Sequence, residues 1–289
     1  MKFEDKYTVA ILGNGFVGSA LGYALSTANI NSQFDIRIYD VDPKRRTHNF
    51  EESVEMSEFI FLCLPTPPKK DYSIDTSIIE SVLKRLSKFD RMDEKIVIVK
   101  STVLPGFCKK MSKKHGLRIV DNPEYLTARN AKMDMIYAPQ ITIGSDDKKT
   151  GERVKELYMA RFGKMKYTMT DSITSEMTKY VLNCFFATKL SFLNEMKQLA
   201  DKIGVNWEKL IEGFVCDLRT GKSHTIVGEN SPDGKLGWGN LCFIKDVSAI
   251  TKFAEDNDVD LKTLKGAWQK NVEVRKGVIE ELEEQVVNK

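Results

Sequence analysis

The stretch Tyr7-Thr8-Val9-Ala10-Ile11-Leu12-Gly13-Asn14-Gly15-Phe16-Val17-Gly18 decides the fold that this sequence predicts. Its first half is an apolar run of the kind that forms a buried β-strand, and its second half is a G-x-G-x-x-G turn. Leu21 and Leu25 continue an apolar pattern at helical spacing, so we expect a helix directly after the turn. This order is typical of a dinucleotide-binding fold, in which the pyrophosphate lies against the N-terminus of the helix.

A carboxylate follows the second predicted strand. That strand, residues 36–39, ends at Asp40, about 20 residues after the glycine turn, where an acidic residue hydrogen-bonds an adenosine ribose. Such a carboxylate repels a 2′-phosphate and favours NAD over NADP, although Lys44, Arg45 and Arg46 soften this preference. We therefore predict NAD as the cofactor, and the alternative is a chance glycine turn.

Strands and helices alternate through the rest of the first half. We expect strands at 59–64, 96–100, 118–120, 140–143 and 165–167, with helices at 76–86 and near 152–162. This alternation predicts an α/β fold class, with a doubly wound, mostly parallel Rossmann-type sheet in an NAD-binding domain over residues 1–170. Ligands of such sheets bind beyond the carboxyl ends of the strands. Thr66, Thr102 and Glu124 follow three of those ends and are candidate site residues, although each could be an ordinary turn or cap residue.

The second half, residues 171–289, is predicted to be an all-helical domain built on one long helix, 172–203. Lys179 and Asn183 lie four residues apart in it, so they project side by side. Such a pair could anchor a substrate hydroxyl and move its proton, and the alternative is an ordinary solvated helix face. A shorter helix is expected at 207–214, a polar loop at 219–238, and a last helix, solvated on most faces, from Lys262 onward.

A cysteine ends the loop Gly237-Trp238-Gly239-Asn240-Leu241-Cys242, directly before a helix that we expect to begin near Phe243. A thiol at a helix N-terminus faces unpaired backbone N–H groups and the positive end of the helix dipole, which favour the thiolate. Lys245 adds a cation, and Asp246 lies one helical turn beyond the cysteine. This arrangement suits covalent catalysis by sulfur, and the alternative is a buried structural cysteine.

Composition excludes several other classes of function. The net charge of +3 comes from 44 basic and 41 acidic residues with no basic block, which gives nucleic-acid binding no support. The longest apolar runs are too short to span a bilayer, and the N-terminus does not resemble a signal peptide. The five cysteines and three histidines are scattered, so we predict a reducing, cytoplasmic location, with no disulfide framework and no metal site.

Taken together, these motifs resemble the UDP-glucose/GDP-mannose dehydrogenase family, most closely its UDP-glucose 6-dehydrogenases. The resemblance runs through the chain in order, and the cysteine loop is similar to the family's Gly-Phe-Gly-Gly-Ser-Cys-Phe-Pro-Lys-Asp. The matching motifs are the glycine turn, Pro65-Thr66-Pro67, Ser101-Thr102-Val103, Asn122-Pro123-Glu124-Tyr125-Leu126, the Lys-Tyr-x-x-Asn segment at 179–183, and the cysteine loop.

The resemblance implies oxidation of the C6 alcohol of a nucleotide sugar, UDP-glucose first, to a carboxylate with two NAD⁺. The intermediates would be a thiohemiacetal and then a thioester on Cys242. Lys179 and Asn183 would stabilise oxyanions, with Lys179 also helping proton transfer. Asp246 and Thr102 would position water or move protons, and Glu124 would promote hydrolysis of the thioester.

Binding roles and assembly are implied in the same way. Arg219 resembles an arginine that reaches the substrate of a neighbouring subunit, and the helix at 172–203 resembles the family's dimerisation element, which implies a homodimer. We assign cofactor binding to Gly13, Gly15, Phe16, Val17, Gly18, Asp40, Arg45, Thr66, Thr102 and Lys245. We assign substrate binding to Glu124, Tyr125, Leu126, Lys179, Asn183, Arg219, Gly239 and Lys245.

Some features depart from the family pattern. Asn240 and Leu241 replace the Gly-Ser that precedes the family's cysteine, and the chain ends at Lys289, so we expect it to lack the family's C-terminal nucleotide-binding domain. Two alternatives therefore stay open. One is a single-step β-hydroxyacid or sugar-phosphate dehydrogenase that makes no use of the thiol, and the other is a non-catalytic NAD-binding dimeric subunit.

Overall fold

The computed structural model describes residues 6–27, 33–127, 129–228, 231 and 233–287. The chain divides into two compact units, and helix α7 (Ser172–Ile203) passes through the boundary between them. Unit 1 comprises Met1–Thr66 and Thr76–Lys179, and unit 2 comprises Pro67–Asp75 and Tyr180–Lys289. The division into functional domains at residue 170 stays a prediction.

Unit 1 is built on a seven-stranded sheet of order β2-β1-β3-β4-β5-β6-β7. Every neighbouring pair is parallel except β5 and β6, so the predicted mostly parallel Rossmann-type sheet is confirmed. The strands are β1 Tyr7–Leu12, β2 Phe34–Tyr39, β3 Phe59–Leu62, β4 Ile96–Val99, β5 Ile119–Asp121, β6 Gln140–Gly144 and β7 Lys166–Thr170.

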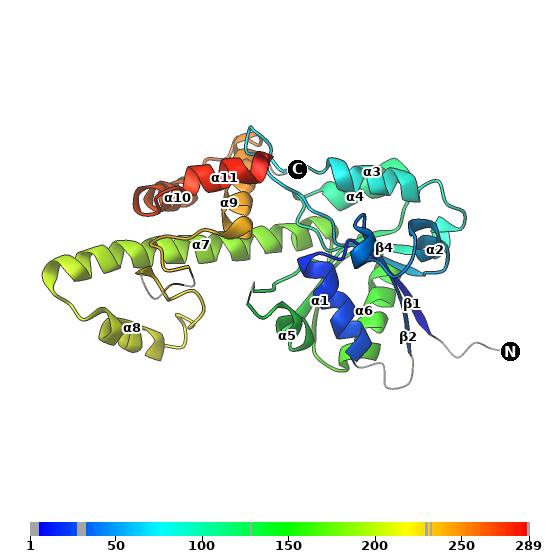
Figure 1. Ribbon diagram of the computed structural model, residues 1–289, viewed down its shortest axis with the longest axis horizontal. Coiled ribbons are helices and arrows are strands. Elements are labelled where there is room, and N and C mark those ends of the chain that lie inside the picture. The colour runs from blue at the N-terminus through cyan, green and yellow to red at the C-terminus, as the bar shows by residue number, and fades with distance from the viewer. Residues whose placement is uncertain (1–5, 28–32, 128, 229–230, 232, 288–289) are drawn as a thin grey trace. The chain divides into compact units, whose positions relative to one another are not determined.

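Helices cover both faces of this sheet (Figure 1). Side chains of α1, α5 and α6 pack on one face, and those of α2, α3 and α4 pack on the other. The helices are α1 Phe16–Thr27, α2 Phe50–Glu55, α3 Ser77–Leu86, α4 Phe107–His115, α5 Ala131–Ile136 and α6 Lys148–Phe162, with short 3₁₀ turns at Pro43–Arg45 and Met92–Glu94.

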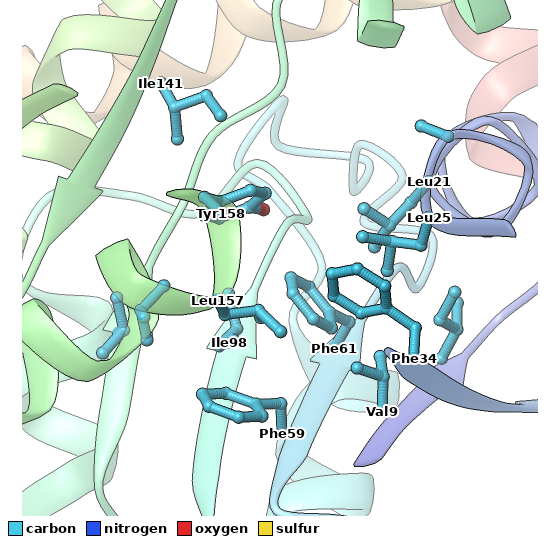
Figure 2. Close-up of a cluster of buried hydrophobic side chains, with 14 of the residues drawn as sticks. Val9, Leu21, Leu25, Phe34, Phe59, Phe61, Ile98, Ile141, Leu157 and Tyr158 are labelled. Atoms are coloured by element: carbon cyan, nitrogen blue, oxygen red, sulfur yellow. The ribbon is translucent and has the colours of Figure 1, made fainter. Parts of the chain in front are cut away.

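The central strands are almost continuously apolar in sequence because both of their faces are buried. In β3, Phe59 and Phe61 point into one cluster, and Ile60 and Leu62 point into the other, because successive side chains of a strand alternate between faces. Figure 2 shows the first cluster, in which Phe59 and Phe61 lie among side chains of neighbouring strands and of helices α1 and α6. A sheet buried on both faces has no position for a polar side chain in its middle.

The turn between β1 and α1 requires glycine at two of the three glycine positions of its G-x-G-x-x-G motif. Gly13 has φ +96°, and a Cβ atom there would overlap the carbonyl oxygen of Cys63. A Cβ atom on Gly18 would overlap the carbonyl oxygen of Gly13, so this glycine lets α1 pack closely against the turn. A Cβ atom on Gly15 would meet nothing within 4 Å. Gly13 and Gly18 are therefore needed by the fold itself, whereas Gly15 is not.

Unit 2 is helical, as predicted. Beyond α7 it contains α8 Trp207–Cys216, α9 Asn240–Glu255, α10 Lys262–Val274 and α11 Val278–Val287, and the last three contact one another (Figure 1). Within the described residues, no helix is long and apolar enough to cross a membrane.

Two predictions for the helices of unit 2 are wrong. Helix α9 begins at Asn240 rather than near Phe243, so Cys242 lies in its first turn instead of before it. The single last helix expected from Lys262 is two helices, because Gly277 has φ +83° and breaks the helical path. Their other expected property is confirmed: Leu264, Ala267 and Asn271 form one buried face of α10, Val278 and Leu282 form one of α11, and most of the other described side chains are at least partly exposed.

We predict that Gly18→Ala destabilises unit 1 by about 1–3 kcal/mol, because the new methyl group must displace the backbone of the turn or the helix. Gly15→Ala adds a methyl group into open space and should change stability by less than about 1 kcal/mol. Urea unfolding of both variants followed by circular dichroism measures the difference. Equal stabilities would show that α1 does not pack as closely as described.

Candidate active site

The carboxylate of Asp40 holds the glycine turn of unit 1. Its Oδ2 accepts a hydrogen bond from the Asn14 backbone N–H at 2.7 Å, and its Oδ1 accepts one from the Asp42 N–H at 2.9 Å. The Asn14 side chain in turn donates to the carbonyl oxygen of Arg45 at 2.5 Å. Asp40 and Arg45 therefore both lie beside the glycine turn. The Asp40 side chain accepts from its backbone, and Arg45 contributes its carbonyl oxygen.

The same turn fits the pyrophosphate of a dinucleotide. Space is open beside Gly15, and the first turn of α1 carries no acidic residue that would repel a phosphate. Phe16 and Val17 begin this helix, where backbone N–H groups have no partner inside the helix and the dipole favours a negative charge. The residues present in unit 1 therefore suit NAD.

Thr66 and Thr102 lie together at the ends of β3 and β4. The Thr66 hydroxyl, which is buried, donates to the Thr102 carbonyl oxygen at 2.9 Å. Next to them, the Ser101 hydroxyl accepts from the Leu64 N–H and donates to the Leu64 carbonyl oxygen. The predicted polar motifs after β3 and β4 are therefore joined by hydrogen bonds at the carboxyl ends of these two strands.

Glu124 and Lys179 form a buried ion pair in unit 1. The Lys179 ammonium donates to Oε1 of Glu124 at 2.8 Å and to the Glu124 carbonyl oxygen at 2.6 Å, and the two side chains are 9% and 7% exposed. The other carboxylate oxygen, Oε2, accepts from the Leu126 N–H at 2.7 Å. The Tyr125 ring lies 5.7 Å from the ammonium, and its hydroxyl donates to Thr142. The structure thus brings four of the predicted substrate residues into one cluster.

This environment sets the protonation of Glu124. Burial by itself would raise the pKa of the carboxyl, but the Lys179 ammonium, the Leu126 N–H and the Lys100 ammonium together lower the pKa below its ordinary value. Glu124 is therefore ionised at neutral pH. An ionised carboxylate can accept a proton from water, which a neutral one cannot.

Lys100 is a buried cation that the sequence motifs did not single out. Its ammonium donates to Oδ1 of Asn122 at 3.0 Å, and the same oxygen accepts from the hydroxyl of Tyr158. Burial lowers the pKa of Lys100 to about 8. Its position directly before Ser101 at the end of β4 was the one available signal, since strand ends carry the ligand sites of such sheets.

Three side chains of the kinds that bind metal ions lie close together elsewhere in unit 1. Cys108, Asp121 and Glu176 bring their ligand atoms within 4.8 Å of one another. Both oxygens of Glu176 accept backbone N–H groups, from Gly106 and from Cys108, at the start of α4. Burial raises the pKa of Asp121 well above its ordinary value, and that of Glu176 as well. The Glu176 carboxylate caps the start of α4, and the raised pKa values follow from burial, so we assign no metal to this cluster.

Asp246 is the centre of a second cluster, which lies in unit 2. It is 1% exposed, and its Oδ2 accepts from the Asn183 side chain at 2.5 Å. Its Oδ1 pairs with the ammonium of Lys245. Cys242 lies one helical turn earlier on α9, and its side chain is exposed. The structure therefore brings Asn183, Lys245 and Asp246 together in unit 2.

The five cysteines differ sharply in environment. Burial raises the pKa of Cys63 and of Cys184 to about 12, and it raises the pKa of Cys108 well above the ordinary value. Cys216 is exposed, but it ends α8, and its thiol donates to the Glu212 carbonyl oxygen. Cys242, by contrast, lies in the first turn of α9, and the N-terminus of a helix is a position that favours a thiolate.

Gly239 and Arg219 complete the predicted set. Gly239 directly precedes α9, where a Cβ atom would overlap the guanidinium of Arg275. Arg219 pairs with the neighbouring Asp217, and its side chain is 90% exposed. Among the described residues, the ion pair of Arg219 is with this aspartate and not with the cluster around Asp246.

Known proteins match both parts of the chain. Residues 44–161 match the NAD binding domain of the UDP-glucose/GDP-mannose dehydrogenase family, and residues 173–273 match the central domain of the same family. The chain is 31% identical over 231 residues to the UDP-glucose 6-dehydrogenase of Rickettsia felis, across 78% of this chain and 50% of that protein. It thus spans about half the length of the curated relatives it matches.

Solved structures share the fold. A UDP-glucose dehydrogenase from the archaeon Pyrobaculum islandicum has a TM-score of 0.80 at 24% identity, over 94% of this chain and 69% of that one. A 3-hydroxyisobutyrate dehydrogenase from Mycobacterium tuberculosis has a TM-score of 0.67 at 18% identity, over 91% of each chain. At such identities the likeness concerns the fold alone.

The matched NAD binding domain confirms the cofactor predicted from the glycine turn and Asp40. It is followed along the chain by the matched central domain, in the order that the motifs predicted. The chain therefore belongs to the UDP-glucose/GDP-mannose dehydrogenase family.

Proposed function

We propose that this chain carries out the NAD-dependent oxidation of the C6 alcohol of a nucleotide sugar, UDP-glucose, to the carboxylate, with Cys242 as the covalent nucleophile. One observation supports this proposal above the others. Cys242 is the exposed thiol in the first turn of a helix, and the same helix carries Asp246 in its buried contact with Asn183. The names of the relatives support the substrate class.

The proposed reaction consists of two oxidations and one hydrolysis. Bound NAD supplies the hydride acceptor for each oxidation. The first oxidation removes a hydride from C6 and the proton from its hydroxyl group, which leaves an aldehyde. The Cys242 thiolate adds to the C6 aldehyde and forms a carbon–sulfur bond, and the oxyanion then takes up a proton to give a thiohemiacetal. Oxidation of that adduct gives a thioester. Water then attacks the thioester, the carbon–sulfur bond breaks, and the carboxylate and the thiol are released.

The polar residues of the candidate site have different roles in this reaction, which follow from the charge or hydrogen-bonding groups of each side chain. Lys179 and Asn183 stabilise the negative charge that develops on the C6 oxygen, because an ammonium and an amide N–H are both donors. Glu124, which is held ionised, accepts a proton from the attacking water. Asp246 and Thr102 assist proton movement, and Lys245 orders the cysteine turn through its contact with Asp246.

We also propose that the chain forms a homodimer through α7. Five apolar side chains of this helix are between 49% and 66% exposed, namely Val181, Phe185, Phe192, Leu199 and Ile203. Their spacings of four and seven residues place them on one stripe of the helix, and an exposed apolar stripe of this kind is typical of a protein interface. Arg219, exposed on the same unit, would reach the substrate of the partner subunit. A cytoplasmic location stays a prediction from the scattered cysteines.

The stoichiometry of NADH tests the reaction directly. With UDP-glucose limiting and NAD⁺ in excess, we expect two NADH per sugar and a carboxylate product, because both oxidations occur before release. Absorbance at the nicotinamide band together with mass spectrometry of the product measures both quantities. Cys242→Ser should not produce two NADH, since a serine hydroxyl holds the aldehyde far less readily than a thiolate.

Other stoichiometries would favour the alternatives. One NADH per substrate, with UDP-glucose or with a β-hydroxyacid or sugar phosphate, would point to the single-step dehydrogenase. Binding of NAD without turnover of any of these substrates would point to the non-catalytic subunit. Full four-electron turnover by Cys242→Ser would contradict the covalent mechanism.

Glu124→Gln should separate oxidation from hydrolysis. The amide oxygen can still accept from Lys179, but the side chain can no longer take a proton from water. We expect a rapid burst of two NADH per site in the first turnover, followed by a steady rate lower by about 10²–10⁴-fold, the usual loss for a missing general base. Rapid-mixing absorbance measures the burst. An unchanged steady rate would assign the hydrolysis to another group.

A charge in the apolar stripe of α7 should break the dimer. Phe185→Glu places a carboxylate where two apolar surfaces would meet, so we expect the chain to sediment as a monomer in analytical ultracentrifugation. Gln198→Glu adds the same charge at an exposed position outside the stripe, where Lys270 still donates to it, and should leave the dimer intact. A wild-type monomer at all concentrations would contradict the dimer.

A further inference from the structure

The loop that leads into α9 is held by side chains from two other helices of unit 2. Asn271 of α10 binds the backbone of Trp238 on both sides, since its Oδ1 accepts from the Trp238 N–H at 2.7 Å and its Nδ2 donates to the Trp238 carbonyl oxygen at 2.8 Å. Asn194 of α7 accepts from the Gly237 N–H at 3.0 Å. Both asparagines are fully buried.

The Trp238 side chain and Gly239 are fixed as well. The indole N–H of Trp238 donates to the Ser191 hydroxyl at 2.8 Å, and that hydroxyl donates to the Ala267 carbonyl oxygen. Gly239 packs so closely on the guanidinium of Arg275 that a Cβ atom would overlap it. Arg275 is itself held by Glu281. Each residue from 237 to 239 is thus in contact with a buried side chain from elsewhere in unit 2, namely that of Asn194, Asn271 or Arg275.

The free-energy cost of burying two asparagine side chains indicates that they serve to position the loop. Burying the carboxamides of Asn194 and Asn271 is unfavourable unless their donors and acceptors are satisfied. The loop backbone satisfies both groups of Asn271 and the acceptor of Asn194, whose Nδ2 donates to the Leu190 carbonyl oxygen of its own helix. Such buried polar networks fix one conformation where an apolar core would allow several. The conformation that they fix is the direction in which α9 begins, and Cys242 lies in its first turn.

We propose that Asn271 and Asn194 are positioning residues that keep the Cys242 thiol reactive, by holding the first turn of α9 so that its backbone N–H groups face the sulfur. This inference rests on the proposed role of Cys242. Fixed dipoles stabilise a charge far better than mobile ones, because no energy is spent in reorienting them. Gly239 has no side chain to cap the helix, so the orientation of the first turn depends on the residues that hold the loop.

The test measures the reactivity of Cys242 without any substrate. Alkylation by iodoacetamide is followed across a range of pH, and peptide mass spectrometry reads Cys242 and Cys216 separately. We expect Asn271→Leu and Asn194→Leu to reduce the alkylation rate of Cys242 at pH 7 by about tenfold, the loss of thiolate that follows a rise of one pKa unit. The rate at Cys216 should not change.

Matched variants separate positioning from a general loss of structure. At this fully buried position a protonated carboxyl in Asn194→Asp keeps the acceptor for the Gly237 N–H and a donor for the Leu190 carbonyl oxygen, so this variant should restore most of the alkylation rate that Asn194→Leu loses. Asn257→Leu, which changes an exposed asparagine at the other end of α9, should match the wild type. If Asn271→Leu does not fold, the two Asn194 variants still decide the question.

The possible outcomes separate this inference from the proposed reaction. A wild-type pH profile at Cys242 in folded Asn271→Leu or Asn194→Leu would overturn the inference. So would equal losses in Asn194→Leu and Asn194→Asp. If the pH profile shifts as expected while UDP-glucose is not oxidised, the positioning role stands and the proposed function fails.

Discussion

Two buried carboxylates of this protein depend on hydrogen-bond donors from one helix. Asp246 in unit 2 and Glu124 in unit 1 are 1% and 9% exposed, and an ionised carboxylate without partners would cost several kcal/mol at such depth. Helix α7 supplies Asn183 to the first and Lys179 to the second. A single turn of α7 therefore supplies a hydrogen-bond donor to one buried carboxylate in each unit.

The chemistry of sulfur in this chain follows from position rather than from the residue itself. Three thiols lie in apolar surroundings that raise their pKa values, and an exposed one lies at a helix C-terminus. Cys242 alone among the described cysteines combines exposure with the first turn of a helix. The buried asparagines that hold residues 237 and 238 give that turn a defined direction, which a glycine-containing loop by itself would not have.

Local patterns predicted much of the fold, and contacts distant in sequence explain what was missed. The apolar strands and the glycine turn were predictable because burial on both faces and close packing at Gly18 leave their mark on neighbouring residues. The start of α9 was misplaced because it depends on Asn194 and Asn271, which lie far from it in the sequence. The buried Lys100 was missed for a similar reason, since its partner Asn122 lies on another strand end. The family motifs identified Glu124 and Lys179, but only the structure shows that they pair.

The central claim is that the sugar becomes covalently attached to Cys242 during turnover. Acid quenching of Glu124→Gln in the presence of UDP-glucose and NAD⁺, followed by digestion and peptide mass spectrometry, tests it most directly, because slow hydrolysis lets the adduct accumulate. We predict a mass increase equal to the acyl group of the oxidised nucleotide sugar on the peptide that contains Cys242. An adduct on Cys216, or complete turnover with every cysteine peptide unmodified, would contradict the account.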